Sequence, residues 1–156
     1  MRVLLSVGCN RYEFTSPLSG AERDAKAISD SLTGRADHRY SPETSRLLLS
    51  PRANEFRSVL SDMLYDNEVT VFTFYFAGHA VVFEDTLYLA FVDCNPDRIA
   101  STAIAFPETL RVTASARPKQ VNFVLDACNS SGLGFDLAAI LRELLMELMS
   151  STFAKF

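Results

Sequence analysis

The chain has 156 residues, of which 48% are apolar and 22% are charged, and its 15 basic and 19 acidic residues give a net charge of −4. This length and composition fit a single hydrophobic core, so we expect residues 1–156 to form one domain. The weak negative charge gives no electrostatic basis for binding nucleic acid or an anionic membrane surface. No apolar run approaches the roughly 18 residues that a membrane-spanning helix needs.

The three cysteines, Cys9, Cys94 and Cys128, are far apart and form no C-x-x-C pair. An odd number of widely spaced thiols does not indicate a disulfide framework. Only His38 and His79 could add nitrogen ligands, which is too few for a zinc site, so no metal or other cofactor is expected. The N-terminal residues do not resemble a secretory signal, and we expect a protein of the reducing cytoplasm.

The first half of the chain alternates between strand-like and helix-like segments. Residues 2–7 predict a strand, and residues 46–49 predict a second one. Residues 20–32 predict a helix because their apolar residues recur at helical spacing, and Gly34 is a suitable stop. Residues 53–65 show the same period and predict a second helix.

The second half continues this alternation and contains the most strand-like segment, residues 69–76. These residues are rich in β-branched and aromatic types and are apolar on both alternating faces, which is typical of a central strand covered by helices on both sides. The alternation predicts an α/β fold, a three-layer αβα sandwich around a mostly parallel sheet. The remaining expectations are strands over 87–92 and 121–125, a helix over 136–149, and surface loops over 34–45 and 93–107.

Two apolar segments each end in one reactive side chain. Residues 74–79 (FYFAGH) end in His79, and residues 124–128 (VLDAC) end in Cys128. Active sites of parallel sheets gather at the carboxyl ends of the strands, where a histidine and a cysteine together can form an activated thiol nucleophile. The polar residues that follow Cys128 would bring backbone N–H groups close to it, as an oxyanion hole requires. The pair predicts a cysteine hydrolase, although each residue taken alone is equally compatible with a structural role.

Three motifs resemble those of the caspase and metacaspase clan. YFAGHA at 75–80 is similar to the family segment F-Y-x-G-H-G, and LDACNSSG at 125–132 is similar to D-x-C-x-S-G. LLSVGCNRY at 4–12, followed by LSGAERDA at 18–25, resembles the metacaspase first strand and the helix start L-x-G-x-x-N-D-A. The 49 residues between His79 and Cys128 match the caspase spacing. The chain thus resembles the large-subunit, p20-like domain of a caspase or metacaspase, of the prokaryotic type.

The resemblance implies roles for individual residues of a cysteine endopeptidase. Cys128 would be the nucleophile, and His79 would be the general acid/base that protonates the leaving amine. The backbone N–H groups of Cys128 and Ala80 would bind the oxyanion. Ala80 stands where the family usually has glycine, which is tolerable only if the backbone there does not need a positive φ.

The resemblance also implies the substrate specificity. In metacaspases two aspartates line the S1 pocket, and Asp24 and Asp126 occupy those positions here. Two carboxylates favour an Arg or Lys side chain. Caspases that select aspartate carry Arg and Gln where this chain has Leu18 and Asp126, so we predict cleavage after basic residues. The simpler alternatives are a first-turn helix acid for Asp24 and a turn-capping acid for Asp126.

Calcium activation, which many metacaspases show, is not expected for this chain. The loop comparable to their acidic cluster, residues 104–108, lacks paired aspartates. Asp93, Asp97 and Asp136 are more readily interpreted as scattered solvated acids.

Only 28 residues follow Cys128, whereas family members continue with a small-subunit region. The helix expected over 136–149 carries more apolar residues than one amphipathic stripe needs. We expect it to pack partly on the sheet and partly against a small-subunit region or a second copy of the chain. Besides a peptidase acting on protein or peptide substrates, two alternatives remain: a low-activity or inactive caspase-fold assembly module, and another α/β cysteine hydrolase such as an amidase.

Overall fold

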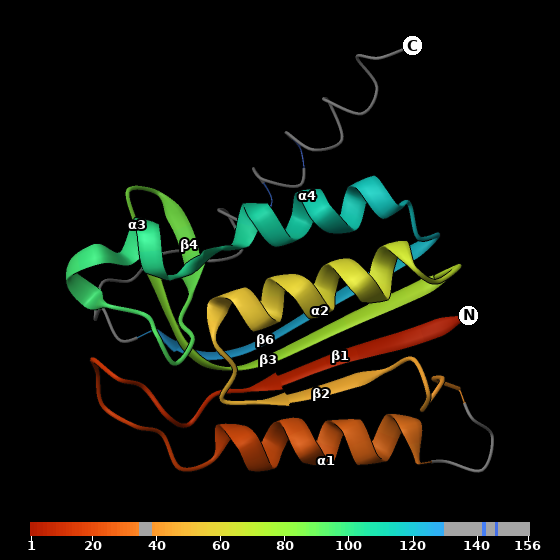
Figure 1. Cartoon of the computed structure of the whole chain (residues 1–156), viewed down its shortest axis with the longest axis horizontal. Helices are drawn as coiled ribbons and strands as arrows, with labels where there is room; N and C mark the ends of the chain where they lie inside the picture. The colour runs from red at the N-terminus through yellow and green to blue at the C-terminus, as the bar shows by residue number, and fades with distance from the viewer. Residues whose placement is uncertain (35–38, 130–141, 143–145, 147–156) are drawn as a thin grey trace.

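The computed structural model describes residues 1–34, 39–129, 142 and 146 (Figure 1). This part of the chain has an α/β fold, in which a mixed parallel and antiparallel sheet of six strands is covered by helices on both faces. The described residues include no helix long and apolar enough to cross a bilayer. The helix expected over 136–149 lies, apart from Arg142 and Met146, outside the described residues.

Four parallel strands form the centre of the sheet. β1 (Arg2–Gly8) pairs with β2 (Arg46–Leu49) on one side and with β3 (Val71–Phe83) on the other. The opposite edge of β3 pairs in parallel with β6 (Gln120–Asn129). The mostly parallel sheet predicted from the sequence is therefore confirmed.

Helices cover the two faces of this sheet (Figure 1). α1 (Ala21–Thr33) lies on one face, whereas α2 (Ala53–Tyr65) and α4 (Phe106–Ala116) lie on the other. Side chains of β3 alternate between the two layers, as a pleated strand requires. Phe72, Phe74 and Phe76 are fully buried in the cluster that contains α2 and α4, while Tyr75 and Ala77 pack with Ala21 and Ala25 of α1.

β3 extends well beyond the predicted strand over 69–76. After β1 ends, β3 continues and turns back through a two-residue loop, Glu84–Asp85, into antiparallel β4 (Thr86–Leu89). The φ angles of 47° and 58° at these two residues match a type I′ hairpin turn, which the pattern N-G or D-G would have signalled. His79 therefore lies within a strand, and the strand expected over 87–92 is a shorter return strand.

The surface loop predicted over residues 93–107 is wrong. This stretch forms a 3₁₀ turn η1 (Pro96–Arg98), a short helix α3 (Ile99–Thr102) and a short strand β5 (Ile104–Ala105), and α4 begins at Phe106. Two buried polar residues hide the helical period of α4, because Thr109 and Thr113 occupy core positions beside Phe106 and Leu110. The Thr113 hydroxyl donates to the Thr109 carbonyl at 2.8 Å, so its burial leaves no donor unpaired.

Candidate active site

The structure pairs the two residues that the sequence predicts as nucleophile and acid/base. In the parallel ladder of β3 and β6, His79 is the Cα partner of Cys128, and Ala77 is the partner of Asp126. Both pairs lie at or beyond Gly8, where β1 ends its pairing with β3. The main chain thus brings positions 79 and 128 together at the carboxyl edge of the parallel strands. The side chain of Cys128 is outside the described part of the structure.

The imidazole of His79 is anchored through one nitrogen. Its Nε2 lies 2.9 Å from the carbonyl oxygen of Ser16, in the loop between β1 and α1. A carbonyl can only accept a hydrogen bond, so Nε2 carries the proton and donates it. The other nitrogen, Nδ1, is buried and has no partner among the described residues. The neutral ring therefore presents Nδ1 as its basic nitrogen.

Tyr12 of the same loop holds the main chain at His79. Its hydroxyl accepts a hydrogen bond from the His79 N–H at 2.9 Å and donates one to the Cys9 carbonyl at 3.1 Å. The two rings are also in contact, with centroids 4.7 Å apart. A Cβ on Gly78 would lie 2.9 Å from the Tyr12 hydroxyl and 2.9 Å from the Phe76 ring, so only glycine leaves room for this arrangement.

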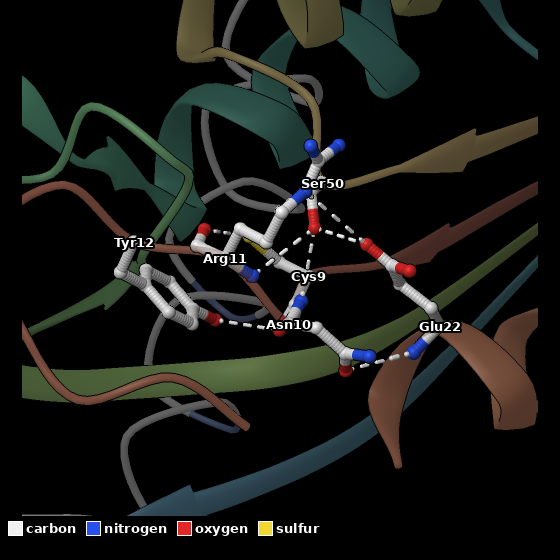
Figure 2. A network of polar contacts seen from close by, with 6 residues as sticks. All are labelled: Cys9, Asn10, Arg11, Tyr12, Glu22 and Ser50. Atoms are coloured by element: carbon white, nitrogen blue, oxygen red, sulfur yellow. Dashed lines mark hydrogen bonds and ion pairs between the residues drawn. The ribbon is translucent and has the colours of Figure 1, made fainter. Parts of the chain in front are cut away.

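A polar network fixes the start of this loop (Figure 2). The Ser50 hydroxyl accepts from the N–H groups of Asn10 and Arg11 at 3.1 Å each, and it donates to the carboxylate of Glu22. The Asn10 side-chain oxygen in turn accepts from the Glu22 N–H at 3.1 Å, at the start of α1. The thiol of Cys9 donates to the Arg11 carbonyl at 3.3 Å. The loop that carries Tyr12 and Ser16 is thus tied to β2 and α1.

The two cysteines outside the predicted site are buried thiols. Burial raises the pKa of Cys9 to about 11 and also raises the pKa of Cys94. Such thiols stay protonated near neutral pH, and a protonated thiol is a poor nucleophile. These findings fit the structural role that the sequence suggests for both residues.

Asp24 and Asp126 lie near one tyrosine hydroxyl. The Tyr75 hydroxyl donates to Oδ2 of Asp126 at 3.3 Å. Burial, reinforced by the nearby charges of Asp126 and then of Asp24, raises the pKa of Tyr75 to about 12. The carboxylate of Asp24 is also 3.4 Å from Nε of Arg23, but that exposed ion pair contributes little. Carboxylates from α1 and β6 therefore gather on the α1 face of β3.

The backbone at Ala80 does not have a positive φ, so an alanine is tolerated where the family usually has glycine. Among the described residues, positive φ angles outside glycine occur only at Ser50, Glu84, Asp85 and Arg117. Ala80 itself is buried within β3, paired with Leu89 on one side and Asn129 on the other.

Two acidic residues of the stretch considered for calcium binding have other partners in the protein. Asp93 accepts a hydrogen bond from the Ala53 N–H at 3.0 Å and so caps α2. Glu108 pairs with Arg57, whose Nε lies 2.7 Å from its carboxylate. In the part of the chain that the structure describes, no three His, Cys, Asp or Glu side chains are grouped as metal ligands. Asp136 lies outside that part.

Sequence reasoning missed Tyr12 and Ser16. Ser16 acts through its carbonyl oxygen, which every residue type possesses, so no side-chain signal marks it. Tyr12 stands within the segment that resembles the metacaspase first strand, but its contact with His79 spans 67 residues of sequence and depends on the fold.

Comparison with known proteins places this geometry in a family. A family model for the caspase domain matches residues 1–147, which is nearly the whole chain. A search of curated proteins found no significant match. The matched region includes β1, the loop with Tyr12 and Ser16, and both His79 and Cys128. The chain belongs to the caspase-domain family of cysteine peptidases.

Proposed function

We propose that this protein is a cysteine endopeptidase that uses Cys128 and His79 to cleave after arginine or lysine. One observation carries the proposal: His79 pairs with Cys128 across adjacent parallel strands, while its Nε2 is anchored on the Ser16 carbonyl. That anchor leaves Nδ1 as the nitrogen available for proton transfer. The metacaspase-like assignment rests on the motifs and on the two aspartates.

Formation of the thioester in the proposed reaction needs two proton transfers at His79. Nδ1 accepts the thiol proton of Cys128, and the thiolate attacks the scissile carbonyl carbon to form a C–S bond. The backbone N–H groups of Ala80 and Cys128 stabilise the oxyanion. The imidazolium then gives its Nδ1 proton to the leaving amine as the C–N bond breaks. Water, deprotonated by His79, hydrolyses the thioester and regenerates the thiol.

The Ser16 carbonyl supports both proton transfers. It keeps the proton on Nε2, so the ring alternates between neutral and cationic forms at Nδ1 alone. It also stabilises the imidazolium, because the hydrogen bond from Nε2 strengthens when the ring is charged. We infer that Ser16 acts as the positioning group for the acid/base.

The proposed specificity for basic residues rests on Asp24 and Asp126. A guanidinium or ammonium group placed between them would form charge-assisted hydrogen bonds, whereas an aspartate side chain would be repelled. The Tyr75 hydroxyl already donates to Asp126 and faces the same charges. Positions 126 and 128 share one face of β6, since successive residues of a strand alternate. The basic side chain would thus enter close to the nucleophile.

Hydrolysis of fluorogenic peptides tests this function. Peptides ending in Arg or Lys should be cleaved, and the matching Asp peptide should not. Cys128→Ala and His79→Ala should each lower kcat/KM by at least about a thousandfold. Asp24→Asn should weaken cleavage of the Arg peptide, whereas the matched change Asp30→Asn, at an exposed acid of the same helix paired with Lys26, should not. Cleavage that survives Cys128→Ala contradicts the proposal.

A second candidate function, assembly, is favoured by the edge of β6. Among the described residues β6 pairs only with β3, and Val124 of this strand is 48% exposed. An open strand edge is a template for another chain. We propose that a small-subunit region or a second copy of the chain binds here and against the segment 136–149. Sedimentation should show association that increases with protein concentration, and association without any peptide cleavage would favour the assembly module over the peptidase.

The proposed reaction also implies where the protein acts and whether it needs calcium. We expect the protein to act in the cytoplasm, where a reducing environment keeps the Cys128 thiol available. We also expect cleavage without added calcium, and loss of cleavage on addition of a calcium chelator would contradict this.

A further inference from the structure

A small cavity lies beside His79 on the side of β4. It has a volume of about 160 Å³, and its apolar walls include Val81, Ala90, Pro96 and Ile99, with Thr15 at its edge. Among the described residues, no carboxylate, lysine or arginine lines it. Its chemistry is therefore opposite to that of the acidic region around Asp24 and Asp126.

The position of this cavity relative to His79 indicates which part of a substrate would enter it. The Ala90 N–H donates to the His79 carbonyl at 2.9 Å, so Ala90 flanks His79 on one edge of β3, while Cys128 pairs with His79 on the other edge. In the reaction proposed above the acyl carbon is bonded to Cys128 and the leaving amine receives its proton from His79. The residue that carries this amine must therefore extend from Cys128 past His79, toward the cavity.

We propose that this cavity is a binding subsite for an apolar side chain of the residue that directly follows the scissile bond. The inference rests on the proposed peptidase function and extends it to the leaving side of the substrate. A cavity of about 150 Å³ lined by apolar groups can hold a benzene molecule, so the volume here suits a side chain such as that of leucine. A charged side chain would lose its hydration and find no counter-ion among the lining residues that the structure describes.

The residues that line the subsite are held in fixed positions, so the subsite can distinguish an apolar side chain from other side chains. Ala90 and Cys94, which also lines the cavity, are each only 5% exposed, so packing on their far side holds them in place. Ile99 is half-buried at the start of α3 and presents the largest aliphatic side chain of the lining. An apolar occupant would also exclude water from the region where His79 meets the leaving amine.

Peptides with a fixed arginine and a varied following residue test the subsite. Binding to the Cys128→Ala variant is measured by fluorescence anisotropy, and kcat/KM is measured with the unmodified protein. The peptide with leucine after the arginine should have an affinity and a kcat/KM about tenfold higher than the peptide with glycine. Both values should be lower for the peptide with aspartate than for the one with glycine. Equal values for leucine and glycine, preference for aspartate or lysine, or absence of binding by either peptide would overturn the subsite.

A variant of the wall gives a second test. Ile99→Ala should lower the leucine-to-glycine ratio about threefold or more, and Ile99→Val should lower it less. The matched control is Ile28→Ala, which removes the same atoms from a half-buried isoleucine on α1 that packs in a different hydrophobic cluster, and should preserve the ratio. An unchanged ratio in Ile99→Ala would overturn the proposal.

The two measurements separate this inference from the peptidase proposal. Cleavage that does not depend on the residue after arginine overturns the subsite alone. Preferential binding of the leucine peptide by Cys128→Ala, without cleavage by the unmodified protein, overturns the peptidase and retains the subsite.

Discussion

The orientation of the His79 imidazole depends on two residues of one loop. The Ser16 carbonyl accepts a hydrogen bond from Nε2, and Tyr12 binds the main chain of His79 and contacts its ring. Neither residue donates or accepts a proton in the proposed reaction. Both act by limiting the positions that the ring can adopt, and a small displacement of a reacting group is costly in a catalytic site.

Replacing Tyr12 with phenylalanine tests this positioning role. Tyr12→Phe leaves the His79 N–H without its acceptor, which should lower the free energy of unfolding by about 1–2 kcal/mol. It should also lower kcat by about tenfold with little change in KM, because the main chain that carries the His79 ring loses its hydrogen bond to Tyr12. Urea unfolding and steady-state kinetics measure the two effects. Tyr88→Phe is the control, since the Tyr88 hydroxyl has no hydrogen bond among the described residues, and equal loss of kcat in both variants would refute the role.

Tyr75 acts on the other side of the site, at the acidic pair. Its hydroxyl orients Asp126, so Tyr75→Phe should raise KM for an arginine peptide about threefold and leave kcat unchanged. Tyr40→Phe provides the comparison, because the hydrogen bond of the Tyr40 hydroxyl goes to Thr73, at 2.8 Å. A change in kcat without a change in KM would show that Tyr75 does not serve substrate binding.

At the scale of elements, the apolar patterns in the first half of the chain were sufficient to predict its strands and helices. The helix at 53–65 has the bounds that its hydrophobic period indicates, because its apolar residues face one core. The strand at 46–49 also has the predicted bounds. The extension of β3 and the start of α4 could not be predicted in the same way. The first depends on a turn without glycine or asparagine. The second depends on two buried threonines, of which Thr113 donates its hydroxyl hydrogen to the Thr109 carbonyl inside the helix.

The β3–β4 turn itself offers a stability test. Asp85 has a φ of 58°, a region that glycine adopts at lower cost, so Asp85→Gly should raise the free energy of unfolding by about 0.5–1 kcal/mol. Asp66→Gly is the matched change at a residue with a φ of −87°, where glycine only adds freedom to the unfolded chain and should destabilise. Urea unfolding of the two variants checks the difference, and destabilisation by Asp85→Gly would contradict the turn assignment.

At the scale of the whole molecule, buried acidic groups predict how stability depends on pH. Burial raises the pKa of Cys9 from 9.0 to about 11 and that of Tyr75 from 10.0 to about 12, and burial also raises the pKa of Tyr12. The folded state keeps these protons at pH values where the unfolded chain loses them. The contribution is complete below pH 9 and is lost as the pH rises from about 9 toward 12.

The free energy of unfolding should therefore fall steadily above pH 9, and urea unfolding between pH 7.5 and 10.5 would measure this decline. Cys9→Ala should give a shallower decline, whatever its stability at pH 7.5. A free energy that stays constant or rises over this range would refute the prediction.

The predicted site residues come from separate parts of the chain, and the fold brings their positions to one edge. His79, Cys128 and Asp126 could be proposed from motifs because each lies at the end of an apolar segment of sequence, and Asp24 could be proposed from the start of a helix. Their common location follows from the parallel register of β3 and β6 and from the packing of α1 on the same face. The loop that orients His79 could not be predicted, because its contacts join distant residues through backbone groups.

The most direct test of the proposed dyad and its specificity is the site of labelling by an arginine chloromethylketone, determined by mass spectrometry. We predict one label per chain, on Cys128, formed faster than with the matching aspartate reagent and greatly slowed in His79→Ala. Cys9 and Cys94 should remain unlabelled because both are buried and have raised pKa values. A label on either of these cysteines, no label at all, or equal rates with the aspartate reagent would contradict the proposed dyad and its specificity.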